Sequence, residues 1–481
     1  MVEQTNNLST MQRIFRNAFW LLMQLAGGRL LSLFLAIILA RYLGVEGYGN
    51  FSFIMAFVGF FAVFGNLGLE IYTVKEVSSN KKLTGIFFGN GLVLNIFLAF
   101  IVGSLMVGTS NMLYVDNNFL HAIYLMGLSY IFCQVGSFFN SFFIAHENMV
   151  YVFVMELAHK ISLFVLCAAC VFLKLDFIYI AGAYVIASIV YLTCTLGFTL
   201  KFFEIKISSE LDDYICMLKN SFPYGLSAIA LVVYFSADIM ILSFFKNNEV
   251  VGIYSAAYKL FISLGIISSI YLGAVFPVLS RLFKESPAGL KKAYDKTFKF
   301  LLIIGVPLSF GGIILSKKII VFIYDAPFLS AFVPFSILTS IVAINFFNAF
   351  FGHFLAAIGK VGDNLKYLSL ACFTNIILNL ILIPKFGYIG SALSTVVSEL
   401  IFFIWAFNYL KKKGYFFMPG KLLGKIFVFS LIMSGILALI SGLNVIVLIA
   451  MGALIYLTLI WVTKTVDTDD LKLLKEAIGF K

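Results

Sequence analysis

Ionisable side chains inside long apolar runs are the features of this sequence most able to do chemistry. A charged group at the centre of a membrane-spanning helix costs about 2.5 to 3.5 kcal/mol on insertion scales, so each is a candidate for a functional role. Such groups bind ions or charged substrates, or they pair with one another. Nine lie in apolar segments: Arg29, Glu70, Glu156, His159, Lys160, Asp238, Lys259, His353 and Glu399.

Arg29 lies in the middle of the first apolar run, beside a polar stripe of Gln24, Gly28 and Ser32 at positions i, i+4 and i+8. No acidic residue shares that run. A guanidinium presents a planar fork of donors that suits a phosphate or a carboxylate. The pattern predicts that Arg29 faces a wet cavity and binds an anionic group. An ion pair with an acid on another helix is the alternative.

Lys259 is the middle residue of a second polar stripe, with Ser255 and Ser263 one helical turn to either side. It lies eight residues from the outer end of its run, and Asp238 lies seven residues from the outer end of the preceding run. Both therefore reach a depth of about 10 to 12 Å at 1.5 Å per residue. Because the two residues lie at a similar depth, Lys259 and Asp238 are predicted to form an ion pair. This pair is either structural or is broken by a substrate or a proton.

Two further acids have open interpretations. Glu156 and Lys160 are at i and i+4, a spacing that favours mutual neutralisation on one helix. Glu399 either lines a cleft or packs against a neighbouring helix, and it shares its run with three hydroxyl side chains: Ser391, Thr395 and Ser398.

Motifs for metal binding or enzymatic catalysis are weak or missing in this sequence. Cys167 and Cys170 have the CxxC spacing, but they lie in an apolar run without further ligands at metal spacing. Glu156 and His159 have an ExxH spacing without the second copy that a di-iron bundle needs. No P-loop or catalytic triad is present. We therefore expect no enzymatic activity, no metal and no cofactor, and energy from an H⁺ or Na⁺ gradient or from a partner.

The composition determines the class of protein that positions these residues. Of 481 residues, 62% are apolar and 12% are charged, with a mean hydropathy of +1.03. Soluble domains are about half apolar and a quarter charged. The composition excludes a soluble enzyme, a secreted disulfide scaffold and a disordered chain. A polytopic membrane protein is predicted, and its six cysteines are not expected to form disulfides.

Apolar runs of about 20 residues predict fourteen transmembrane helices. Their approximate limits are 17–40, 51–74, 84–109, 119–145, 150–173, 177–200, 220–245, 251–279, 297–316, 328–358, 364–383, 388–410, 421–442 and 444–463. Of the 34 lysines and arginines, 25 lie on the side of the two termini and six on the other side. Because cations are enriched on the cytoplasmic side, both termini are predicted to be cytoplasmic, and the net charge of +11 needs no nucleic acid partner.

The two halves of the chain share three short matches, which predict an internal duplication. The offsets between the matched segments are 203, 208 and 209 residues. Six helices per copy give two parallel bundles related by an axis along the membrane normal, which rock to alternate access. The predicted domains are residues 1–200, a cytoplasmic linker at 201–219, residues 220–413, and helices 13 and 14 with the tail at 414–481. The matched segments are 49–52 with 252–255, 138–143 with 346–351, and 179–183 with 388–392.

At several connections the chain resembles the O-antigen type (Wzx-like) oligosaccharide and polysaccharide flippases of the multidrug/oligosaccharidyl-lipid/polysaccharide exporter (MOP) superfamily, to which the multidrug and toxin extruders (MATE) also belong. The resemblance covers nearly the whole chain. The segments that carry it are Ala40-Arg41-Tyr42-Leu43-Gly44, Glu46-Gly47-Tyr48-Gly49, Ala237-Asp238, Val251-Gly252-Ile253-Tyr254-Ser255-Ala256-Ala257-Tyr258-Lys259 and Pro384-Lys385-Phe386-Gly387-Tyr388-Ile389-Gly390-Ser391-Ala392.

The resemblance implies a MATE-like fold and a bacterial inner-membrane flippase for undecaprenyl-diphosphate-linked glycan units. It implies membrane lipids as surroundings, and a glycan polymerase and a chain-length regulator as partners. By residue type and place, a cationic central cavity is assigned to Arg29, Lys259 and Lys160, and coupling or gating to Asp238, Glu156 and Glu399. The polar lining is assigned to Gln24, Ser32, Ser255 and Ser263.

Three other functions stay open. A lipid II flippase has the same number of helices and a cationic cavity, and its loss is lethal. A drug/cation antiporter often has an acid in its first helix, where this chain has Arg29. A membrane glycosyltransferase or polymerase usually needs a sizeable catalytic loop outside the membrane, and the predicted loops are short.

Overall fold

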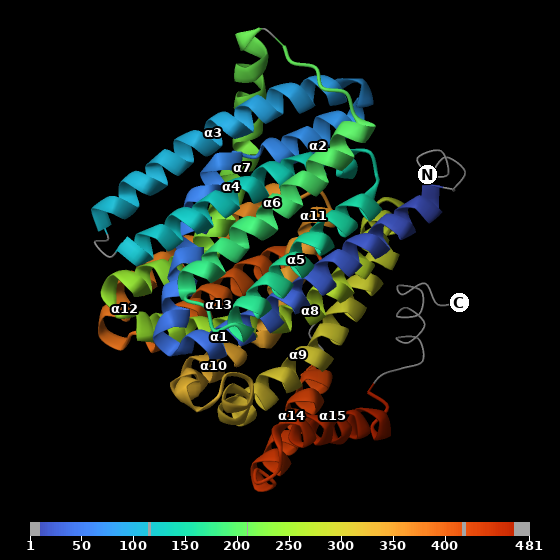
Figure 1. Ribbon diagram of the computed structural model, residues 1–481. Coiled ribbons are helices and arrows are strands. Elements are labelled where there is room, and N and C mark those ends of the chain that lie inside the picture. Colours follow the sequence, from blue (N-terminus) through green and yellow to red (C-terminus); the bar gives the residue numbers. More distant parts are fainter. Residues whose placement is uncertain (1–9, 114–116, 209, 416–419, 466–481) are drawn as a thin grey trace. The chain divides into compact units, whose positions relative to one another are not determined.

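The computed structural model describes residues 10–113, 117–208, 210–415 and 420–465, and every regular element in these ranges is a helix (Figure 1). In chain order the elements are α1 (Thr10–Asn66), α2 (Leu69–Ser79), the 3-10 helix η2 (Lys81–Leu83), α3 (Thr84–Leu113), α4 (Asn117–Ala145), α5 (Met149–Phe172), α6 (Phe177–Phe202), α7 (Leu211–Phe245), α8 (Asn248–Glu285), α9 (Pro287–Tyr324), the 3-10 helix η3 (Ala326–Ala331), α10 (Phe332–Thr339), α11 (Val342–Ala357), α12 (Val361–Phe386), α13 (Tyr388–Lys412), α14 (Gly420–Leu439) and α15 (Val445–Val462).

The described helices make this a multi-pass membrane protein. Eleven of them are long and apolar enough to cross a membrane, or 13 segments if each of two bent pairs is one span. The count of fourteen stays a prediction. The first candidate, Phe19–Ser79, has 61 residues and overlaps both of the first two predicted spans.

Helix α1 is interrupted at Gly44, where φ is 67° and ψ is −176°. Glycine adopts a positive φ without the steric cost that a Cβ brings. The 57 residues of α1 would extend about 85 Å as one straight helix, whereas the hydrocarbon core is about 30 Å thick. The break divides α1 within the connection that the sequence predicts between residues 40 and 51.

Contacts between residues divide the chain into two compact units. Unit 1 contains Met1–Leu43 and Asn50–Met240, and unit 2 contains Gly44–Gly49 and Ile241–Lys481. The predicted linker at residues 201–219 lies within unit 1, where α6 ends at Phe202 and α7 begins at Leu211. The predicted division into two six-helix bundles stays a prediction.

In unit 1, α4 packs against α2, α3, α5 and α6. One face of α4 is aromatic: the Phe88 ring of α3 lies 5.4 Å from that of Phe139 and 5.3 Å from that of Phe142. All three rings are buried. Aromatic pairs at these distances add to the area that they bury. This face joins α4 to α3, and Leu192 and Leu196 of α6 pack against the same cluster.

In unit 2, α8 packs against α9, α10, α11 and α13, and α14 packs against α9 and α15. The α9–α11 contact includes Phe298 and Phe347, whose rings stack at 4.2 Å. The segment Gly44–Gly49 lies against the start of α8 in the same unit. A Cβ on Gly49 would lie 1.8 Å from the Asn248 carbonyl oxygen, and one on Gly252 would lie 2.0 Å from the Val45 carbonyl oxygen. Only glycine permits this approach of two backbones.

The predicted span at residues 328–358 is broken in the structure. η3 leads into α10, which ends at Thr339. α11 then starts at Val342 after a bend of 52°. The hydroxyls of Thr339 and Ser340 donate to the Phe335 and Ile337 carbonyls at 2.9 and 2.6 Å. Such bonds back to the same helix compete with its ladder and favour a bend.

Candidate functional site

The Arg29 side chain is exposed on α1, and its neighbour Gln24 is half-buried. The Ser32 hydroxyl donates to the Gly28 carbonyl oxygen at 2.8 Å. Ser32 therefore uses its proton within its own helix and keeps only acceptor capacity for a ligand. The predicted polar stripe exists on one helix, and its role in binding stays a prediction.

A buried polar cluster joins three helices of unit 1. The Asn140 amide of α4 donates to the Tyr191 hydroxyl of α6 at 2.6 Å, and Tyr191 donates to Glu156 Oε1 of α5 at 2.7 Å. A third, longer contact of 3.4 Å runs from Asn140 to the same Glu156 oxygen. Asn140 is 4% exposed and Tyr191 is 2% exposed. Because Tyr191 has one proton, it can donate to the carboxylate only while it accepts from Asn140.

Glu156 has neutral partners in this cluster. No ion pair between Glu156 and Lys160 is found in the described part of the chain, although one helical turn separates them. The Lys160 side chain is half-buried, and no hydrogen bond or ion pair of its ammonium is found among the described residues. Its assignment to a cationic cavity stays a prediction.

A second polar cluster of unit 1 surrounds Glu70 of α2. The Ser137 hydroxyl of α4 donates to the Glu70 carboxylate, and the Asn66 side chain accepts from the Glu70 backbone N–H at 3.3 Å. One turn before Ser137, the Gln134 amide donates to Asn95 at 3.4 Å. Gln134, Ser137 and Asn140 recur every three residues in an apolar helix, and this period is the sequence signal for the polar face of α4.

Glu399 of α13 is 7% exposed and lies in a third cluster, in unit 2. The Asn348 amide of α11 donates to Glu399 Oε2 at 2.6 Å and to the Glu399 carbonyl oxygen at 2.9 Å. Asn345 donates to Oε1 at 3.3 Å. Of the two interpretations that the sequence leaves open, packing against a neighbouring helix describes these contacts.

The other hydroxyls of this α13 face are also buried. Thr395 lies 3.3 Å from the Tyr254 hydroxyl of α8, and the Asn375 amide of α12 donates to Ser398 at 3.4 Å. Ser391 is buried at the start of the same face. Polar side chains thus connect α13 to α8, α11 and α12 within unit 2.

The clusters of the two units correspond at two positions. Asn140 and Asn348 are 208 residues apart, and so are Tyr191 and Glu399. In each unit the asparagine donates its amide to the side chain at the corresponding position of the other helix. This offset is one of those found in the sequence matches. The duplication and its arrangement in space remain predictions.

Lys259 is half-buried on α8, and the Ser263 hydroxyl donates to its carbonyl oxygen at 2.7 Å. Ser255 is buried, and its hydroxyl makes no hydrogen bond among the described residues. Asp238 is 1% exposed and belongs to unit 1, whereas Lys259 belongs to unit 2. A pair between Asp238 and Lys259 stays a prediction.

The described residues include no group of three or more histidine, cysteine, aspartate or glutamate side chains that could hold a metal ion. All six cysteines lie in the described ranges and are free thiols. Cys167 is buried in α5.

Several known proteins resemble the chain. A family model described as "Polysaccharide biosynthesis protein" matches residues 14–283, more than half of the chain. An uncharacterized membrane protein of Methanocaldococcus jannaschii is 25% identical over 406 residues, 76% of this chain and 77% of its own length. The probable low-salt glycan biosynthesis flippase Agl15 of Haloferax volcanii is 24% identical over 212 residues, 44% of this chain and 45% of its own length. This match thus spans less than half of either protein.

Solved structures show the same fold. The lipid II flippase MurJ in an inward closed conformation has a TM-score of 0.75 at 17% identity, with 90% of this chain and 96% of MurJ covered. An inward-facing multidrug resistance transporter of the MATE family and the MOP superfamily has a TM-score of 0.63 at 12% identity, with 80% and 95% covered. These structures show the fold, and the family match over residues 14–283 establishes that the chain belongs to the polysaccharide biosynthesis protein family.

Proposed function

We propose that this protein is a flippase that moves lipid-linked glycan units across a membrane for polysaccharide biosynthesis. The observation that carries the proposal is the polysaccharide biosynthesis family match over residues 14–283, in a chain with 11 to 13 candidate spans. Two relatives in Haloferax volcanii, Agl15 and AglR, are named as probable flippases, and neither is named as an enzyme.

The substrate that we propose is an undecaprenyl-diphosphate-linked oligosaccharide repeat unit of a bacterial surface polysaccharide. The protein lies in the inner membrane with both termini in the cytoplasm, as the distribution of lysine and arginine favours. A diphosphate headgroup carries a negative charge through the membrane, so the protein must supply cations along its path.

Three cations are proposed to bind the diphosphate: Arg29, Lys160 and Lys259. Arg29 can bind phosphate oxygens through two parallel N–H groups. The half-buried Lys160, without an ion pair among the described residues, supports its inclusion. Ser255 is one of the polar side chains assigned to the cavity lining. Its buried hydroxyl makes no hydrogen bond among the described residues, so it can form one with a sugar hydroxyl.

The acids Asp238, Glu156 and Glu399 are proposed to couple transport to an H⁺ or Na⁺ gradient. Glu156 and Glu399 accept hydrogen bonds that link helices within their units. A protonated carboxyl has less acceptor capacity and one donor of its own, so protonation changes these links. Each acid can therefore translate the arrival of a proton into a change of helix packing, as alternating access requires.

Gene deletion tests the proposal. Lipid-linked single repeat units should accumulate and surface polysaccharide should be lost, and the wild-type gene should restore export. Arg29→Ala should not restore it. Arg281→Ala is the matched control, because Arg281 is exposed near the end of α8 and its pair with Glu285 is 3.7 Å long.

Two outcomes would overturn the proposed function, and a third would overturn only the assignment of the cations. Unchanged glycan with increased drug sensitivity would identify a drug exporter. Lethal loss with accumulated lipid II would identify a lipid II flippase. Full export by Arg29→Ala, Lys160→Ala and Lys259→Ala variants at normal expression would remove these cations from the substrate path and leave the flippase function itself intact.

A further inference from the structure

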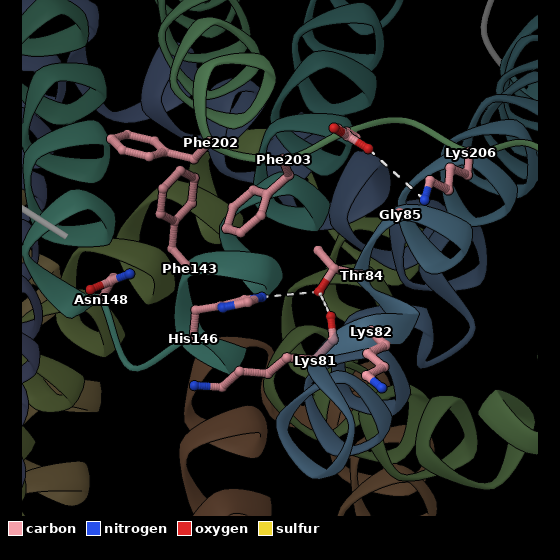
Figure 2. A pocket seen from close by; sticks show the side chains of 11 residues that line it. Lys81, Lys82, Thr84, Gly85, Phe143, His146, Asn148, Phe202, Phe203 and Lys206 are labelled. Carbon is pink, nitrogen blue, oxygen red and sulfur yellow. Dashed lines mark hydrogen bonds and ion pairs between the residues drawn. The ribbon is translucent and has the colours of Figure 1, made fainter. Parts of the chain in front are cut away.

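A cavity of about 430 Å³ lies in unit 1, at connections between its helices. Its lining comes from η2, from the start of α3, from the turn between α4 and α5, and from the end of α6 with the segment that follows it (Figure 2). The sequence assigns all these connections to the cytoplasmic side of the membrane. We call this cavity the basic pocket.

Three lysines surround the basic pocket: Lys81, Lys82 and Lys206. All three side chains are exposed. Glu204 is the only acid of the lining and lies 3.9 Å from Lys206, with both side chains largely exposed. Such a pair contributes little, so the lysines keep most of their attraction for an anion.

The backbone around these lysines is fixed. The Lys206 N–H donates to the Gly85 carbonyl oxygen at 3.0 Å, and the Ser208 N–H donates to the Asn90 side chain at 2.9 Å. A Cβ on Gly89 would lie 2.2 Å from the Lys206 carbonyl oxygen. The segment after α6 therefore lies directly on the glycines of α3, which positions Lys206 at the pocket.

Aromatic rings form the other wall. The Phe143 ring lies 5.4 Å from that of Phe203 and 6.1 Å from that of Phe202, and Figure 2 shows the three rings grouped beside His146. The His146 ring lies 4.8 Å from that of Phe203. A ligand that filled the pocket would thus contact cations on one side and apolar rings on the other.

His146 and Thr84 connect the two walls. His146 Nε2 lies 3.0 Å from the Thr84 hydroxyl, which donates to the Lys81 carbonyl oxygen at 2.6 Å. Because the hydroxyl proton is used for Lys81, the histidine Nε2 carries the proton in its contact with Thr84. Asn80 also accepts from the Lys82 N–H at 3.2 Å, so that η2 is held in place for its lysines.

We propose that the basic pocket binds the phosphate headgroup of an anionic phospholipid from the cytoplasmic leaflet. The lysines bind the phosphate, and the phenylalanines contact the glycerol and the first methylene groups. A free phosphate would use the cations but would gain nothing from the three rings. Each lysine at the cytoplasmic surface raises the affinity for anionic lipids about fivefold. The proposal does not depend on what the protein transports.

Native mass spectrometry of the delipidated full-length protein tests this site, with phosphatidylglycerol and phosphatidylcholine of matched acyl chains as probes. Wild-type protein should retain phosphatidylglycerol preferentially. The double variant Lys81→Gln/Lys82→Gln should bind phosphatidylglycerol about 10- to 30-fold more weakly, because it lacks two lysine contacts. The matched control is Lys291→Gln/Lys292→Gln, an adjacent exposed pair on α9 that removes the same charge.

Three results would overturn the proposal. Equal losses in the two double variants would show a general effect of charge, and equal retention of the two lipids would show no headgroup selectivity. Displacement of phosphatidylglycerol by millimolar inorganic phosphate would assign the pocket to a soluble anion. If the Lys81/Lys82 variant does not fold, Lys206→Gln replaces it, because the Lys206 side chain is 66% exposed. This substitution should lower the affinity for phosphatidylglycerol about fivefold.

Discussion

The Asn348 amide lies 2.6 Å from the Glu399 carboxylate, and 208 residues earlier the Asn140 amide lies 2.6 Å from the Tyr191 hydroxyl. Each asparagine is the middle of a nearly identical aromatic sequence, Phe-Phe-Asn-Ser-Phe-Phe in α4 and Phe-Phe-Asn-Ala-Phe-Phe in α11. The aromatic residues pack within each unit, while the asparagine faces a polar partner. The partner differs in kind: it is a hydroxyl in unit 1 and a carboxyl group in unit 2.

Replacement of Asn348 by alanine should destabilise the protein. The substitution removes the shortest donor to the buried Glu399 carboxylate and a second bond to its carbonyl oxygen. A buried acceptor left without its donor costs about 1 to 3 kcal/mol. Thermal unfolding in detergent should show a lower Tm. Asn345→Ala is the control, because its contact with Glu399 is 3.3 Å long; an equal or larger loss for Asn345→Ala would contradict the prediction.

Two variants separate the structural and the coupling roles of Glu156. Tyr191→Phe removes the 2.7 Å donor of the carboxylate and should lower stability by about 1 to 3 kcal/mol. Glu156→Gln keeps a side-chain oxygen as acceptor and should retain the fold, but it cannot exchange a proton. If Glu156 couples transport, Glu156→Gln should stop glycan export at a Tm close to that of the wild type. Normal export would limit Glu156 to a structural role.

Alanine at Gly49 or Gly252 should separate two backbones of unit 2. The added Cβ would lie 1.8 or 2.0 Å from a carbonyl oxygen, far inside van der Waals contact, and a backbone atom cannot turn away as a side chain can. Each variant should reduce the amount of folded protein in a fluorescence-detected size-exclusion assay. Gly424→Ala in α14 is the matched control, because nothing lies within 4 Å of its Cβ position. Equal amounts of folded protein from the three variants would show that residues 44–49 and the start of α8 can move apart without loss of stability.

The sequence predicts the helices well because a membrane leaves the backbone few alternatives. The predicted spans at 150–173 and 177–200 agree with α5 and α6 to within two residues. The break within residues 328–358 was not predicted, because it depends on where Thr339 and Ser340 direct their hydroxyls. An apolar run predicts the length of a helix and its burial, but it does not predict a local bend.

The site was predicted only in part. Glu156 and Glu399 stand out in the sequence because they are ionisable residues in apolar runs. Their partners Asn140, Asn348 and Tyr191 are neutral, so the sequence does not single them out. The interpretation of Glu156 and Lys160 as a pair on one helix followed from their spacing alone. In the structure the Glu156 carboxylate is bound by side chains of α4 and α6, and such contacts between helices cannot be read from one helix.

Stability should depend on pH through His146, in the turn between α4 and α5. Burial, with a smaller contribution from the charge of Lys81, lowers the pKa of His146 from its usual value. The folded protein then binds fewer protons at this group than the unfolded chain, whose histidine titrates at about 6.5. The free energy of unfolding should therefore fall as the pH decreases through 6.5, and His146→Gln should remove that part of the loss. Unfolding in detergent at pH 7.5 and pH 5.5 measures this difference, with the exposed His121→Gln as control. The prediction is wrong if His146→Gln loses as much stability on acidification as the wild type.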